Sequence, residues 1–90
     1  MRYFVVLDLR SAIGSIYENG NNDGFVTDGK MKHPVLDCTE IAIDSPYYLF
    51  ATRDMSKTGR SHQHLHIPHG SIVAIHHYAE EEKPVGFMTS

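Results

Sequence analysis

The stretch that decides the fold is residues 62–79, which read HQHLHIPHGSIVAIHHYA. Its first six residues alternate, which is the pattern of a β-strand with two different faces. The motif Pro68-His69-Gly70 then predicts a tight turn, and the apolar run over residues 71–79 predicts a second strand. The segment is therefore a strand–turn–strand unit. One face of its first strand carries His62, His64 and His66, and the other carries Gln63, Leu65 and Ile67.

Other strands are predicted upstream of this unit. Residues 47–54 (YYLFATRD) are rich in aromatic and β-branched side chains, and residues 35–43 (VLDCTEIAI) form a strand that begins after Pro34. Residues 25–27 are short and strand-like, between turn signals at residues 18–24 and 28–29. For residues 1–17 the pattern leaves two alternatives open, a first strand or a helix that continues to Tyr17.

These short strands predict a mainly β fold, a meander that closes into a small barrel, because closure removes aggregation-prone edges. Residues 47–51 and 72–75 are apolar at successive positions. A small barrel covers only the inward face of such strands. We expect a neighbouring subunit to cover the outward face, with coverage by the chain itself as the alternative.

The composition describes one small domain. The chain has 90 residues, 41% of them hydrophobic, and a net charge of −3. A core this small is thin. We expect a single domain over residues 1–79 and a charged tail over residues 80–90. Cys38 is a lone cysteine, which fits a reducing, cytoplasmic location and excludes a disulfide framework. The sequence shows no signal segment and no membrane-spanning run, so no membrane partner is expected.

The charge is unevenly distributed. Residues 45–79 carry three basic side chains and six histidines against one acidic residue, so this block is the candidate surface for a polyanion. Its basic residues are Arg53, Lys57 and Arg60. Aromatic residues nearby offer stacking surfaces for bases, although we expect Tyr48 and Phe50 to be core residues. Because histidine gains charge near pH 6.5, such binding is expected to strengthen in mild acid.

The alternating histidines suggest two kinds of chemistry. Imidazoles at positions 62, 64 and 66 are candidate ligands for zinc, nickel or copper, although a polar outer strand face is the simpler interpretation. The same pattern imitates the triad of histidine-triad nucleotide hydrolases, but the chain is too short for that fold. The acidic residues have no paired spacing typical of acid–base catalysis. We therefore expect neither an enzyme nor a cofactor.

The segment from Leu65 to Ile75 resembles the second signature of Sm and LSm proteins, with Ile67 ending a strand and Gly70 in the turn. His69 stands where that family has Arg, and the turn is one residue longer. Residues 28–37 (DGKMKHPVLD) resemble the first signature, with Lys32 where Asn is usual. The chain's size and histidine-rich end also resemble small Sm-like proteins attributed to cyanophages.

This resemblance implies a strongly bent, five-stranded Sm-like (SH3-like) barrel, preceded in that family by a short N-terminal helix. It implies a homo-oligomeric ring in which the strand at residues 62–67 of one subunit pairs with the strand at residues 71–79 of the next. It also implies RNA binding at two turns that face the pore. The residues at those two positions are Met31, Lys32 and His33, and Pro68, His69 and Gly70.

The sequence therefore predicts an Sm-like ring protein that binds RNA or single-stranded DNA through these turns and through Arg53, Lys57 and Arg60. One alternative is an oligomeric scaffold without nucleic-acid binding. A second alternative is a histidine-rich metal-binding protein.

Overall fold

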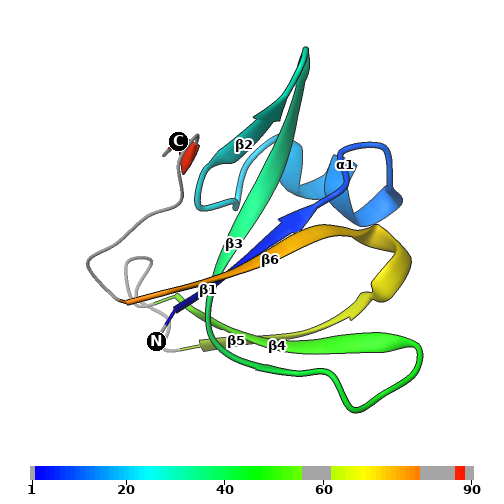
Figure 1. Ribbon diagram of the computed structural model, residues 1–90, viewed down its shortest axis with the longest axis vertical. Coiled ribbons are helices and arrows are strands. Elements are labelled where there is room, and N and C mark those ends of the chain that lie inside the picture. Colours follow the sequence, from blue (N-terminus) through cyan, green and yellow to red (C-terminus); the bar gives the residue numbers. More distant parts are fainter. Residues whose placement is uncertain (1, 56–61, 80–86, 89–90) are drawn as a thin grey trace.

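The long strand β3 (Met31–Ala42) organises the sheet, because it pairs in succession with three other strands. The structure is a computed structural model that describes residues 2–55, 62–79 and 87–88 (Figure 1). The other elements are β1 (Arg2–Leu7), α1 (Ala12–Glu18), β2 (Phe25–Asp28), β4 (Tyr48–Asp54), β5 (His62–Pro68), the 3-10 turn η2 (His69–Ser71), β6 (Ile72–Tyr78) and β7 (Phe87–Met88).

The main path of the sheet runs β5-β4-β3-β1-β6, and every pairing is antiparallel. β2 pairs with the first part of β3, and β7 pairs with β2. Among the described strands, β5 pairs only with β4 and β6 only with β1, so the sheet is open. The prediction of a mainly β fold is confirmed, with one short helix.

The first 18 residues contain both of the elements between which the sequence left a choice. Tyr3, Val5 and Leu7 alternate in β1 and face the core, whereas α1 begins after Ser11. The Ser11 hydroxyl accepts a hydrogen bond from the Gly14 amide at 3.0 Å, which caps the helix. The helix therefore follows the first strand. The Sm-like resemblance implied the opposite order, with the helix before the sheet.

Pro34 lies inside β3 and not ahead of it, which corrects the predicted start of this strand. The Val35 amide donates to the Gly24 carbonyl at 2.9 Å, and the Val35 carbonyl accepts from the Asp23 amide at 2.8 Å. Since neighbouring residues of a strand point their backbone groups to opposite edges, Pro34 faces the other edge. There the pairing with β1 has ended at Val6 and Val35, so the missing N–H interrupts no ladder.

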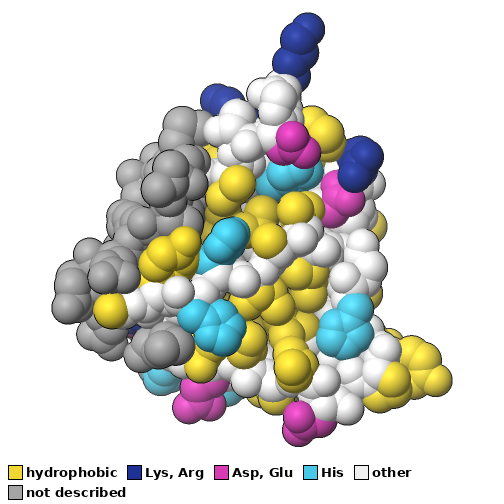
Figure 2. Space-filling view, viewed as in Figure 1, with side chains coloured by type: hydrophobic (Ala, Val, Ile, Leu, Met, Phe, Trp, Pro, Cys, Tyr) yellow, Lys and Arg dark blue, Asp and Glu magenta, His cyan; other side chains and the backbone are white. Residues whose placement is uncertain are grey.

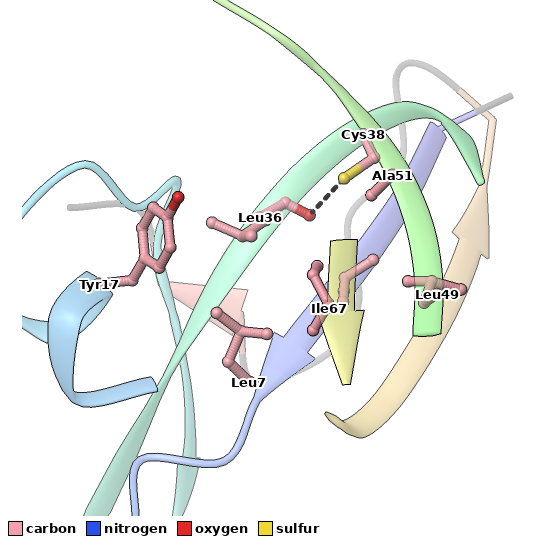
Figure 3. Close-up of a cluster of buried hydrophobic side chains, with 8 residues drawn as sticks. Leu7, Tyr17, Leu36, Cys38, Leu49, Ala51 and Ile67 are labelled. Carbon is pink, nitrogen blue, oxygen red and sulfur yellow. Dashed lines mark hydrogen bonds between the residues drawn. The ribbon is translucent and has the colours of Figure 1, made fainter. Parts of the chain in front are cut away.

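The main core fills the concave side of the sheet (Figure 3). Alternate residues of the strands point into it, and Tyr17 of α1 closes one end beside Leu36 and Leu7. Its fully buried side chains include Leu7, Leu36, Cys38, Leu49, Ala51 and Ile67.

A second, smaller cluster lies on the opposite side of β1. It contains Phe4, Val6 and Val35, packed against Val26, Ala74 and Tyr78. β1 is therefore buried on both faces, which explains why residues 4–7 form an unbroken apolar run.

The part of the chain after residue 79 contributes to the sheet, since Phe87 and Met88 of β7 pair with Val26 and Phe25. The remainder of the predicted charged tail, and residues 56–61 of the predicted polar loop, lie outside the described residues. Within residues 2–55, 62–79 and 87–88, no helix has the length and apolar character needed to cross a membrane.

Candidate functional site

The outward face of β4 and β5 carries a row of aromatic and imidazole rings. We call the side chains of Tyr48, Phe50, His64 and His66 the β4–β5 ring cluster. The Phe50 ring lies 5.1 Å from the His66 ring and 6.0 Å, nearly parallel, from the His64 ring. The Tyr48 ring lies 6.0 Å from the His66 ring. The row is open to solvent, because Tyr48 is 47% and Phe50 40% exposed.

Strand alternation and cross-strand register produce this cluster. Leu49 and Ala51 point into the core, so Tyr48 and Phe50 point out. Phe50 stands opposite His66 and Thr52 opposite His64 in the β4–β5 ladder. The expectation that Tyr48 and Phe50 belong to the core is therefore wrong, since their parity opposes that of the buried residues of β4.

A second group of rings lies at the other edge of the sheet. We call Phe4, His76 and Tyr78 the β1–β6 ring cluster. The Tyr78 ring lies 5.8 Å from the Phe4 ring and 6.0 Å from the His76 ring. Phe4 stands opposite His76 in the β1–β6 ladder. The neighbouring His77 points to the core side, where its ring lies 4.8 Å from the ring of Tyr3.

The alternating histidines of β5 are all exposed, as a polar outer strand face requires. His64 engages its own hairpin through Nδ1, which lies 3.3 Å from the Thr52 hydroxyl oxygen. His62 stands opposite Asp54 in the ladder. Nowhere in the described part of the chain do three or more His, Cys, Asp or Glu side chains come together as a metal ion would require.

Arg53 is a buried structural residue in this fold. Its side chain is 3% exposed and donates to the Asp23 carboxylate at 2.9 Å and to the Gln63 side-chain oxygen at 3.0 Å. The guanidinium also lies 5.6 Å from the centre of the Tyr17 ring. Because Asp23 accepts a second bond from the Asp37 amide at 2.7 Å, this group ties the α1–β2 loop to three strands. Arg53 therefore faces the interior of the fold, where Asp23 and Gln63 hold its guanidinium. The two other predicted basic residues, Lys57 and Arg60, lie outside the described residues.

His33 is also buried, at 3% exposure. Its Nδ1 accepts a hydrogen bond from the Leu9 amide at 3.1 Å, and its Nε2 lies 3.9 Å from an oxygen of Asp28. An Nδ1 that accepts a bond leaves the ring proton on Nε2, on the side of this carboxylate. The ring thus fixes the turn between β1 and α1 to the start of β3.

Met31 and Lys32 lie on β3 beside the tight turn of the β2–β3 hairpin, where Asp28 pairs with Met31. Lys32 is exposed, as is Lys30, which the sequence analysis did not single out although it stands in the same turn. The Lys and Arg side chains visible in Figure 2 gather mainly at the end of the molecule that carries this hairpin.

Pro68, His69 and Gly70 form the end of β5 and the start of η2. The His69 Nε2 lies 2.9 Å from the Ser45 carbonyl oxygen, and the His69 amide donates to the Tyr47 carbonyl at 3.2 Å. The turn is therefore attached to the β3–β4 loop. Figure 1 shows the β2–β3 hairpin tip at one end of the molecule, away from η2. One subunit does not bring the two predicted RNA-binding turns together.

Ionisable groups outside these clusters, among them Asp8 and Cys38, have shifted pKa values. Hydrogen bonds from Arg10 lower the pKa of Asp8, which accepts from the Arg10 amide at 2.9 Å and from its side chain at 3.1 Å. Burial raises the pKa of the Cys38 thiol to about 12. The thiol lies in the main core, 3.7 Å from the Leu36 carbonyl oxygen. Cys38 therefore packs as a small apolar residue.

Comparison with protein-family models, curated proteins and solved structures finds no match for this chain.

Proposed function

We propose that this protein is an Sm-like small β-barrel protein whose copies join head to tail into a homo-oligomeric ring, with β5 of one copy beside β6 of the next. The observation that carries the proposal is the strand order. β5 and β6 are the two ends of the five-strand path, and each has one strand partner among the described elements. Within the described residues, the outer edges of β5 and β6 thus have no strand partner, and they are available to each other in different copies.

The connection between these strands supports the same proposal. Only the three residues of η2 separate β5 from β6, yet the two strands lie at opposite ends of the path. The sheet therefore bends strongly, helped by ladder irregularities at residues 38–40 of β3 and at Val6–Leu7 of β1. A strongly bent sheet with a short turn between its edge strands is the geometry that the Sm-like resemblance implies.

Exposed apolar side chains accompany the two edges. Val73 of β6 is 49% exposed and lies at the irregularity of the β1–β6 ladder, while Tyr48 and Phe50 are exposed beside β5. An edge strand with large apolar neighbours is a site of association. Head-to-tail pairing would use the β5 and β6 edges of every copy, and a closed ring leaves neither of these two edges free.

The test is the oligomeric state, measured by native mass spectrometry and by light scattering during gel filtration. We expect a closed assembly of about five to eight copies, the range that the Sm-like resemblance suggests. Val73→Lys places a charge beside the β6 edge and should shift the assembly towards monomer. Ile16→Lys is the matched control, because Ile16 is 70% exposed on α1 and belongs to neither edge strand. A monomer at micromolar concentration, or equal effects of the two variants, would contradict the ring.

For the nucleic-acid half of the proposal, the supporting observation is the exposed pair Lys30 and Lys32 on the β2–β3 hairpin. A ring repeats this hairpin once per subunit and so multiplies a weak contact. We propose that single-stranded RNA or DNA binds there and at the turn of Pro68, His69 and Gly70. In this proposal the protein is a binding module and not an enzyme.

Fluorescence anisotropy with labelled oligonucleotides tests this half separately. Affinity should fall as salt rises, because phosphate contacts release counterions. Lys30→Gln with Lys32→Gln should weaken binding about tenfold and flatten the salt dependence. Arg10→Gln, which removes an exposed charge already paired with Asp8, should leave binding unchanged. A ring that binds no oligonucleotide at low salt would be the scaffold without nucleic-acid binding.

A further inference from the structure

Both edges of the sheet carry aromatic and imidazole rings, and both groups lie on the same side of it. We propose that the β4–β5 ring cluster and the β1–β6 ring cluster are the two halves of one interface between copies of this chain, which opens when its histidines are protonated. This inference rests on the proposed ring. It adds the residues that line the interface between copies, which we call the seam, and it adds acid pH as the condition that weakens this interface.

The side on which the rings lie follows from the two cores. Leu49 and Ala51 of β4 and Ile67 of β5 belong to the main core, so the β4–β5 ring cluster points to the opposite side. On the other edge, Phe4 and Tyr78 belong to the second cluster, which is opposite the main core across β1. Both ring clusters therefore point away from the main core.

Head-to-tail pairing would bring these clusters together. β5 is the strand at one end of the path and carries His64 and His66 on its outward face. β6 is the strand at the other end and carries His76 and Tyr78 outward. When β5 pairs with β6 of the next copy, the two outward faces become adjacent rows of one sheet, in which side chains of neighbouring strands are in contact distance. The exposed rings of the β4–β5 ring cluster would thus meet the half-buried His76 and Tyr78 of the next copy, whereas Phe4 is already buried with Val6 and Val35 of its own chain.

The chemistry of the two clusters favours a second copy over a nucleic acid as the occupant. Among the described residues, no Lys or Arg side chain belongs to the β4–β5 ring cluster or stands opposite it in the ladder. Arg53 is buried, and Lys30 and Lys32 lie at the tip of the β2–β3 hairpin. In the β1–β6 ladder Arg2 stands opposite Tyr78, but its guanidinium is held by Asp37 at 2.8 Å. A phosphate chain depends on such charges. Two sets of neutral aromatic and imidazole rings instead complement each other by stacking and by burial of apolar area.

Acid should open the seam. A histidine buried between aromatic rings is favoured in its neutral form, because burial disfavours the charged form. In separated copies His64 and His66 are exposed and His76 is half-buried, whereas the seam would cover all three rings, so protonation favours the separated state. Imidazoles on both sides of the seam would also repel one another once charged.

The charged groups around the seam do not cancel this effect. Glu40 stands opposite Thr52, one strand away from His64, and Asp54 stands opposite His62. Arg2 stands opposite Tyr78, contacts Asp37 at 2.8 Å and lies 3.8 Å from Asp54. The acidic side chains Asp37 and Asp54 are thus already engaged by Arg2, and no carboxylate stands opposite His66 or His76 in the described ladders.

The experiment is sedimentation of the full chain over a concentration series at pH 7.5 and pH 5.5. The wild-type assembly should weaken on acidification. The protein concentration at which half of the chains are assembled should rise about tenfold or more, because several histidines must stay neutral in the seam. The double variant His66→Gln, His76→Gln should remain assembled at pH 5.5. His77→Gln is the matched control, since His77 neighbours His76 but points to the core side, and it should respond to pH as the wild type does.

Phe50→Ala tests the seam without titration. It should weaken assembly at both pH values, while circular dichroism verifies the fold. Assembly that is independent of pH and unaffected by Phe50→Ala would overturn the inference and leave the ring in place. Equal effects of His77→Gln and of the double variant His66→Gln, His76→Gln would also overturn it. If Phe50→Ala lowered oligonucleotide binding but not assembly, the occupant would be a nucleic acid and the inference would fail. A wild-type monomer at pH 7.5 would remove the proposed ring itself.

Discussion

Cys38 is a thiol whose burial decides its chemistry. Its side chain is fully buried in the main core, and burial raises its pKa from 9.0 to about 12. Because the thiolate is the reactive form, the folded protein should react with Ellman's reagent at pH 8 at least about a hundredfold more slowly than the unfolded chain. Reaction at the rate of the unfolded chain, in a sample shown to be folded, would contradict the buried position.

The same pKa predicts how stability depends on pH. The folded state holds the thiol proton more tightly than the unfolded state, so the stabilisation is complete below about pH 9 and is lost as the pH rises towards 12. Denaturant titrations at pH 8 and pH 10 should show a falling free energy of unfolding. In Cys38→Ala this alkaline loss should be smaller, although the variant itself costs about 1 kcal/mol at pH 8.

The ion pair of Arg53 and Asp23 offers a comparison between its two partners. Asp23→Ala leaves the guanidinium buried without its carboxylate and should cost about 2–3 kcal/mol, somewhat less than a fully buried pair because Asp23 is one-third exposed. Arg53→Met fills the same space without a charge and should cost less. Urea denaturation of both variants measures the difference. If the two variants lost the same free energy of unfolding, the main role of Asp23 would not be to neutralise the buried guanidinium.

At the scale of the elements, α1 depends on a glycine in an unusual role. A Cβ atom on Gly14 would lie 1.8 Å from the Asp8 carbonyl oxygen, so the helix can only approach the end of β1 with glycine there. Gly14→Ala should therefore destabilise the protein by about 2 kcal/mol or more, although alanine ordinarily favours a helix by about 1 kcal/mol. Thermal unfolding tests this, with Ser15→Ala on the exposed side of α1 as the nearly neutral control.

The amino-acid sequence predicts the bounds of some strands more closely than it predicts the contacts between them. β4, β5 and β6 were predicted within a residue or two of their bounds, because alternation and β-branched residues act locally. The interior role of Arg53 was missed, although it shares parity with Leu49 and Ala51, which point inward. Its partner Asp23 is 30 positions away in a loop, and no local pattern indicates such a pair.

At the scale of the whole molecule, the sequence predicted a mainly β fold but not the order of its first elements. The signal for β1 and the signal for α1 lie next to each other in residues 1–17, and local periodicity does not show that both elements form. Strand pairing is likewise not predicted from the sequence. β3 changes its partner from β2 to β1 at Pro34 and Val35, and only the packed sheet specifies which strand lies beside which.

The main core fills the concave side of the sheet, whereas the outward face of β4 and β5 is exposed, and this asymmetry predicts two different costs for two large side chains. Leu36 is fully buried in the main core, so Leu36→Ala should cost about 2–5 kcal/mol at any protein concentration. Phe50 is 40% exposed on the outward face, so Phe50→Ala should cost less than about 1 kcal/mol in the isolated chain. If the outward face is covered by a neighbouring copy, the cost of Phe50→Ala should grow with protein concentration, because assembly stabilises the folded state by mass action. Denaturation of both variants at a low and a high protein concentration tests this. If the cost of Leu36→Ala also depended on protein concentration, the dependence would come from the stability of the fold as a whole and not from contacts of the outward face.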